Sequence, residues 1–179
     1  MPADNRKMTI NEVNALSPEA FVEGFGFLFE HSPWVVEGAG HDRPFDDSEA
    51  MHSALVRELL EAPEDRRMDV IRAHPRLADK AAIAAGLTKQ SASEQASAGL
   101  DALTPEEFER FGALNAAYDE KFGFPFIVVV RTAGGKVGIL KAMTERLQNT
   151  RDIERRNALN EVVKIVWLRL QDVVKGEFE

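Results

Sequence analysis

Residues 159–174 read LNEVVKIVWLRLQDVV, and the helix that they predict indicates the class of fold. At about 100° per residue, its apolar side chains fall on one stripe of an α-helix, which is the clearest amphipathic pattern in the chain. The stripe consists of Leu159, Val162, Val163, Val166, Leu170, Val173 and Val174. A helix with one apolar stripe must bury it against other elements, so we expect the rest of the chain to supply them.

Helix start and stop signals recur upstream of this helix. Ser17-Pro18 is a cap followed by proline at the first helical position, and Thr104-Pro105-Glu106-Glu107 fits a capping box whose helix Gly123 ends. Strand alternation hardly appears. Further helices are expected after Ser32-Pro33, after Asp46 or Asp47, after Pro63, over residues 78–85 up to Gly86, and after Gly134-Gly135.

The stretch from Phe126 to Val130 has the β-branched content of a strand, but a lone strand has no partner for its hydrogen bonds. We therefore predict an extended segment around residues 124–130, whose buried N–H groups are available to a ligand. The predicted fold class is all-α, with one compact multi-helix domain over residues 1–179.

The composition limits the classes of function. A net charge of −8, with 30 acidic against 22 basic residues, argues against nucleic acid as a partner, because such binding needs a concentrated basic face. The absence of cysteine excludes disulfides, thiolate catalysis and zinc–sulfur sites. No apolar run approaches the roughly 18 residues of a membrane span, and residues 1–8 lack the apolar core of a signal peptide. We expect no membrane partner and a cytoplasmic protein.

Two segments combine a helix break with a side chain that can move a proton. His74 precedes Pro75, which disfavours helix at the histidine, although a solvated loop imidazole is the commoner case. Ser91-Ala92-Ser93-Glu94 fits a second capping box, whose default role is to start a helix toward Leu100. Such a box also places a carboxylate and free amides where a polar ligand can bind.

The remaining histidines and the arginines leave alternatives open. His31, His41 and His52 are as eligible as the histidine before proline on this reasoning, and the four show no spacing for a metal site, so no metal is expected. Arg169 lies at the edge of the apolar stripe, from which it can reach solvent or a cavity between helices. Arg131 and Arg146 are rivals for a ligand-binding role.

Several of these motifs, in this order along most of the chain, resemble the family of 2-oxo-4-hydroxy-4-carboxy-5-ureidoimidazoline (OHCU) decarboxylases. The segments that carry the resemblance are residues 29–35, His74-Pro75, residues 91–95, Ala98-Gly99-Leu100, Asn115, Tyr118, residues 121–127, Arg146-Leu147, Asn149 and Leu168-Arg169-Leu170. The resemblance implies an all-helical fold, usually a homodimer, and decarboxylation of OHCU to (S)-allantoin in urate catabolism.

The resemblance also implies a role for each matching residue. His74 would be the catalytic histidine and Glu94 its acidic companion. The substrate site would be lined by Pro75, by Ser91, Ala92, Ser93, Glu94 and Gln95, by the backbone of Phe126, Ile127, Val128, Val129 and Val130, and by Arg169.

The family substrate explains why no cofactor is expected. Its carboxyl group leaves a carbon next to a ring C=N bond, which accepts the electron pair, so pyridoxal phosphate, thiamine diphosphate and metal have no necessary role. A catalytically silent helical binding or scaffold protein is the alternative. A different enzyme that uses His74, such as a hydrolase, comes third, because cysteine and a Gly-x-Ser-x-Gly elbow are both absent.

Overall fold

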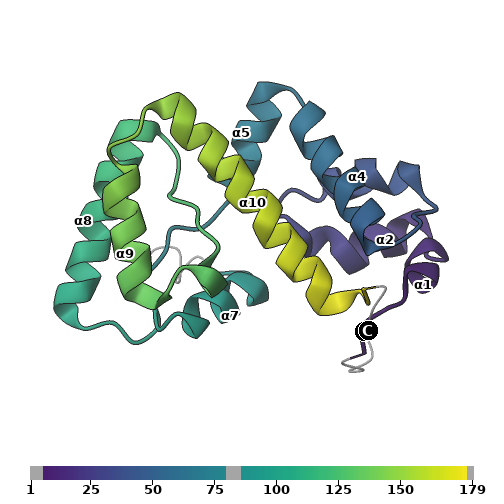
Figure 1. The fold of residues 1–179 in the computed structure, drawn as a ribbon, viewed down its shortest axis with the longest axis horizontal. Helices are drawn as coiled ribbons and strands as arrows, with labels where there is room; N and C mark the ends of the chain where they lie inside the picture. The colour runs from purple at the N-terminus through teal and green to yellow at the C-terminus, as the bar shows by residue number, and fades with distance from the viewer. Residues whose placement is uncertain (1–5, 80–85, 177–179) are drawn as a thin grey trace. The chain divides into compact units, whose positions relative to one another are not determined.

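The computed structural model describes residues 6–79 and 86–176, and most of them are helical (Figure 1). Apart from an isolated bridge between Met8 and Val174, no strand occurs in these ranges, so the predicted all-α class is confirmed. Of the helices described, none combines the length and apolar character that crossing a membrane requires. The prediction of a single domain over residues 1–179 stays a prediction.

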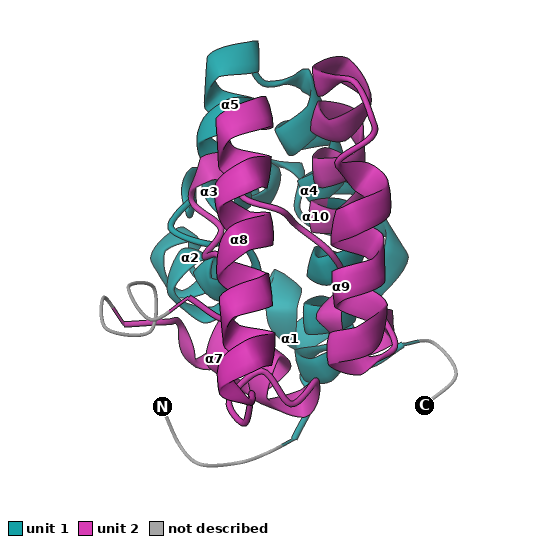
Figure 2. Ribbon diagram, turned by 90° about the vertical axis from the view of Figure 1, so that its left-hand side faces the viewer, with its two compact units in different colours: residues 1–70, 163–179 teal, residues 71–162 magenta. Residues whose placement is uncertain are grey.

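The chain divides into two compact units, residues 1–70 with 163–179 and residues 71–162 (Figure 2). The first contains α1 (Ile10–Asn14), α2 (Pro18–Phe25), η1 (Gly26–Leu28), α3 (Trp34–Ala39), η2 (Gly40–Asp42), α4 (Ser48–Glu61), most of α5 (Glu64–Arg72) and the second part of α10 (Arg151–Val173). The second contains α7 (Lys89–Ser97), α8 (Pro105–Phe122), η3 (Val130–Thr132), α9 (Gly135–Arg146) and the first part of α10.

The predicted caps start and end the helices. The Ser17 and Asp47 side chains accept hydrogen bonds from the first turns of α2 and α4, and Thr104 with Glu107 forms the expected capping box of α8. Gly123 ends α8 with a φ of 77°, which favours glycine. The predicted helix over 78–85 does not begin at its first residues, which are non-helical, and residues 80–85 lie outside the described ranges.

Each unit has its own apolar core. In the first, α3 packs against α2 and α4, and Phe21, Phe25, Leu28, Val35, Met51 and Leu55 are at most 2% exposed. In the second, α8 and α9 lie side by side, and Tyr118 packs edge-on against Phe126 at a centroid distance of 5.3 Å. Of the predicted stripe, Val162, Val166 and Leu170 in α10 and Val174 directly after it are at most 1% exposed, whereas Val163 and Val173 are half-buried.

Candidate active site

His74 lies in a bend that directly follows α5. The helix ends at Arg72, as expected for a histidine before proline, and the His74 amide donates to the Ile71 carbonyl at 3.3 Å. Its side chain is half-buried. The bend therefore places a partly accessible imidazole at the start of a loop, which is the setting that acid–base chemistry needs.

Two buried amide side chains bind the backbone of this loop after Pro75. Gln95 Oε1 accepts a hydrogen bond from the Ala78 amide at 3.1 Å, and Asn115 Nδ2 donates to the Leu77 carbonyl at 2.8 Å. Ala78 has a φ of 54°, a left-handed conformation that costs an alanine roughly 1 kcal/mol. Backbone held in such a conformation persists only where its surroundings fix it, and such strain is common at functional sites.

Gln95 also carries a donor that has no partner. Its Nε2 atom is buried and forms no hydrogen bond with the described residues, and the bond from Ala78 N–H to Oε1 fixes which end of the amide is the nitrogen. A buried donor left unpaired costs about 1 to 3 kcal/mol. The Nε2 atom is therefore a candidate donor to a ligand bound near the loop.

The helix that carries Gln95 does not begin where the sequence analysis expected. The N-cap of α7 is Thr88, whose Oγ1 accepts from the Ser91 amide at 3.2 Å, so Ser91 and Glu94 lie inside the helix and form no capping box. The expected capping role was wrong because the Thr88 cap starts the helix three residues earlier. Ser91 and Gln95 face inward at 5% and 6% exposure, while Ala92 and Ser93 are exposed.

The Glu94 carboxylate faces η3. Its side chain is 12% exposed, and its Oε1 lies 3.5 Å from Nη2 of Arg131, whose side chain is 33% exposed. This ion pair places α7 next to the end of the extended segment. Arg131, one of the rivals for a ligand-binding role, is thus a partner of Glu94.

The segment before η3 is extended and buried, as predicted. Phe126, Ile127, Val129 and Val130 are at most 9% exposed. Side chains pair with part of its backbone, because Arg146 Nη1 donates to the Ile127 carbonyl at 2.7 Å and the Val129 amide donates to Glu161 Oε2 at 2.8 Å. The N–H and C=O of Val128 have no hydrogen-bond partner in the described part of the chain. The expectation of backbone N–H groups available to a ligand therefore fails at Val129 and stays open at Phe126, Ile127, Val128 and Val130, whose N–H groups have no partner among the described residues.

Arg169 belongs to the first unit and is buried at 2% exposure. Its Nη2 lies 3.0 Å from Glu30 Oε1, and its Nη1 donates to the carbonyls of Phe27 and Leu28 at 3.2 and 3.4 Å. The alternative in which this arginine reaches solvent is therefore wrong. Its contact with substrate stays a prediction.

The contacts of His52 are those of a histidine packed inside the first unit. Its Nε2 lies 3.1 Å from the Val163 carbonyl, its ring lies 4.9 Å from that of Trp167, and burial lowers its pKa. His31 and His41 are exposed. No group of three or more histidine and carboxylate side chains is placed to hold a metal ion among the described residues.

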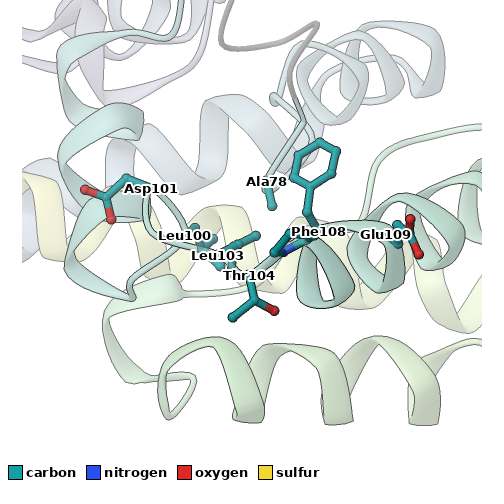
Figure 3. A pocket seen from close by; sticks show the side chains of 8 residues that line it. Ala78, Leu100, Asp101, Leu103, Thr104, Phe108 and Glu109 are labelled. Atoms are coloured by element: carbon teal, nitrogen blue, oxygen red, sulfur yellow. The ribbon is translucent and has the colours of Figure 1, made fainter.

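Two hollows lie along α8 in the second unit. One has a volume of about 510 Å³ and is lined by Ala78, Phe108, Thr104 and Glu109 among others (Figure 3). The other, of about 330 Å³, shares Ala78 and Phe108 and reaches Asn115. Their linings include neither His74 nor Glu94, so we do not assign either hollow to the site.

The second unit thus links three segments that are far apart in sequence. The loop after His74 bonds to Gln95, the neighbouring Glu94 pairs with Arg131, and Arg131 follows the extended segment directly. A sequence model of OHCU decarboxylase matches residues 14–171. The chain belongs to the OHCU decarboxylase family. This match confirms the family resemblance that the sequence motifs indicate.

Relatives of the family agree in sequence and fold. An OHCU decarboxylase of Haloferax volcanii is 38% identical over 171 residues, which cover 96% of this chain and 99% of the relative. The crystal structure of an (S)-allantoin synthase superposes with a TM-score of 0.75 at 28% identity, covering 93% of this chain and 54% of that one. An OHCU decarboxylase crystallised in the presence of (S)-allantoin has the same fold, with a TM-score of 0.67 at 20% identity over 83% of this chain and 94% of that one.

Sequence reasoning assigned no site role to Asn115 or Glu161, which hold the loop and the extended segment. Asn115 had a usable signal, since it follows Phe111 by four residues on the inward face of α8, where a buried polar side chain needs a specific partner. Glu161 had none, because its position on α10 is that of an ordinary solvated carboxylate.

Proposed function

We propose that this protein decarboxylates OHCU to (S)-allantoin without a cofactor, with His74 as the acid–base catalyst and Glu94 as its acidic companion. Membership of the family supports the reaction. The single observation that best supports a substrate site here is the buried Nε2 of Gln95, which has no partner among the described residues and lies in the side chain that binds the strained loop after His74. A hydrogen-bond acceptor on the substrate, such as a ring or ureido carbonyl, would satisfy this donor.

The substrate's own electronic structure defines what the protein must do. The bond between the ring carbon and the carboxylate breaks, and its electron pair forms a C=C bond while the neighbouring C=N nitrogen takes up a proton. The 4-hydroxyl proton then leaves, a C=O bond forms, and a proton is added to the carbon that bears the ureido group. His74 is suited to these proton transfers, which typically contribute about 10² to 10⁴ in rate.

The stereochemistry follows from which face receives the last proton. If the site holds the ring by the Val128 backbone and the Gln95 amide, only one face is open to an acid, and the product has the S configuration. We further expect Pro75, residues 91–95 and the backbone of 126–130 to line this site. We expect a homodimer, which sedimentation velocity would test directly.

Circular dichroism on urate oxidised in situ to OHCU tests the function. The protein should make the (S)-allantoin signal appear faster than in the enzyme-free reaction, and His74→Asn should remove that acceleration. No acceleration by folded wild-type protein would refute the activity. A scaffold protein that binds no small ligand is disfavoured, because it has no need of an unpaired buried donor, which costs stability. A silent binding protein would instead bind (S)-allantoin without accelerating its formation.

A further inference from the structure

Glu154, in the first turn of α10, is completely buried and its carboxylate is surrounded by donors. It receives hydrogen bonds from the Tyr118 hydroxyl, from Asn149 Nδ2 at 2.7 Å and from Asn157 Nδ2 at 2.8 Å. Nε and Nη2 of Arg146 lie 3.0 and 2.9 Å from its Oε2. Burial alone would raise the pKa of Glu154, but these bonds outweigh it and hold the pKa below its usual range.

Arg146, the last residue of α9, connects this carboxylate to the extended segment. Its remaining terminal nitrogen, Nη1, donates to the Ile127 carbonyl at 2.7 Å, and its Cζ lies 4.5 Å from the centre of the Phe126 ring. One guanidinium thus bonds Glu154 with one edge and the backbone of the segment with another. A lysine could not reproduce this, because an ammonium group lacks the planar fork and stacks less well on a ring.

The bond to Ile127 fixes more than one carbonyl. In a trans peptide the C=O of Ile127 and the N–H of Val128 share one plane and point in opposite directions. The Val128 N–H therefore points away from Arg146. On the other side of the same residue, the bond from the Val129 N–H to Glu161 turns the Val128 C=O away from Glu161 in the same manner.

These two bonds account for the orientation of the Val128 backbone, whose N–H and C=O are among the groups of this segment that the described residues leave unpaired. Val128 keeps one donor and one acceptor, while the carbonyl before it and the amide after it are taken by side chains from α9 and α10. Extended backbone offers the N–H and C=O of one residue to the same edge, as paired strands do. The orientation of this pair depends on where the Arg146 guanidinium lies.

We propose that Arg146 and Glu154 are positioning residues of the decarboxylase: Arg146 aims the Val128 backbone at the substrate, and Glu154 acts by holding Arg146. This inference rests on the proposed function, in which residues 126–130 line the site. A buried ion pair is seldom the most stabilising choice for a core, since apolar residues of similar size often do as well. A role in orienting the Val128 backbone would explain why an ion pair occupies this position.

The test compares Arg146→Lys with Ile139→Val. Ile139 is fully buried on the same helix, and its aliphatic side chain makes no hydrogen bond to the segment, so the control lowers stability without releasing Ile127. Arg146→Lys should lower kcat/KM at least 10-fold, raise the Kd for (S)-allantoin, and speed hydrogen exchange at the Val129 amide, which is bonded to Glu161. Ile139→Val should change kcat/KM less than 2-fold. Glu154→Gln, which keeps the volume, should shift all three quantities in the direction of Arg146→Lys.

The outcomes separate this inference from the proposed function. If wild-type protein fails to accelerate (S)-allantoin formation, the proposed function is refuted, and exchange at the Val129 amide alone decides whether the pair orders the segment. If wild type is active and Arg146→Lys matches Ile139→Val in activity, allantoin affinity and exchange, the positioning role is overturned. Loss of the folded state in both Arg146→Lys and Glu154→Gln would also overturn it, because the pair would then serve folding alone.

Discussion

Replacing Gln95 with methionine should leave the free energy of unfolding nearly unchanged and yet lower kcat/KM about 10- to 150-fold. The substitution keeps the side-chain volume, so the core around α7 is not disturbed. It removes the hydrogen bond that Oε1 accepts from the Ala78 amide, which strands a buried N–H at a cost of about 1 to 3 kcal/mol. It also removes the unpartnered Nε2, which relieves a cost of about the same size.

With substrate present the two effects no longer offset each other. The wild-type Nε2 then has a partner, so the variant loses one hydrogen bond to the ligand and the hold on the strained loop, together about 1.5 to 3 kcal/mol. At about 1.4 kcal/mol per tenfold, this range gives the expected loss in kcat/KM. Thermal melting without (S)-allantoin measures the stability of the free variant, and melting with (S)-allantoin measures binding, since a ligand stabilises only a protein that binds it.

Asn115→Leu is the matched control, because Asn115 holds the same loop, is also 6% exposed, and has no unpartnered buried atom. Asn115→Leu removes the hydrogen bond to the Leu77 carbonyl and relieves no unpaired donor, so it should lower the free energy of unfolding by about 1 to 3 kcal/mol in the absence of ligand. The reasoning is refuted if Gln95→Met keeps the full allantoin-induced rise in melting temperature. A ligand-free destabilisation of Gln95→Met beyond that of Asn115→Leu would refute it equally.

Four further substitutions test other parts of the site. His74→Asn should abolish accelerated allantoin formation while its melting temperature stays close to wild type, and near-normal turnover would eliminate this histidine as the catalyst. Glu94→Gln should cost less than about 1 kcal/mol, because its ion pair with Arg131 is partly exposed, but should lower kcat/KM about 100-fold; full activity in that assay would limit the carboxylate to structure. Arg169→Lys should lower the free energy of unfolding by about 2 kcal/mol or more in urea titrations, since lysine cannot reproduce three buried bonds, and an unchanged midpoint would contradict this. Because the folded-state pKa of Glu154 is lowered, the stability that its ionised carboxylate contributes is complete above the ordinary pKa of about 4.5 and is lost as the pH falls through the folded pKa. The difference in the free energy of unfolding between wild type and Glu154→Gln should therefore shrink in acid. A difference that stays constant from neutral to acid pH would contradict this.

Helix boundaries were predictable wherever a local signal had no competitor. Ser17, Asp47 and Gly123 act through bonds or backbone angles within a few residues, so the sequence contains the whole interaction. The start of α7 failed because Thr88 and Ser91 are three residues apart and either can cap a helix, and pattern alone does not rank them. Helix α1 was missed although Thr9 and Glu12 form a capping box, because only a short apolar run follows it.

The segments that the second unit links were named from the sequence, but the bonds that link them were not, and the substrate contacts of these residues stay a prediction. The resemblance picked out His74, Gln95 and the extended segment, but the side chains that orient them act over long separations. Arg146 bonds a carbonyl 19 residues away, and Glu161 bonds an amide 32 residues away. On sequence alone a solvated arginine and one in a buried ion pair look the same, because the difference lies in the tertiary fold.

The unpaired backbone of Val128 has a consequence for how this enzyme can vary. Recognition by an N–H and a C=O is independent of the side chain, so neutral drift at position 128 among Val, Ile and Thr would leave the chemistry intact. A saturation mutagenesis screen scored on turnover would therefore rate this position as tolerant and overlook it. Proline, which alone among the amino acids lacks the N–H, is the replacement that should lower turnover if the Val128 peptide group binds the substrate.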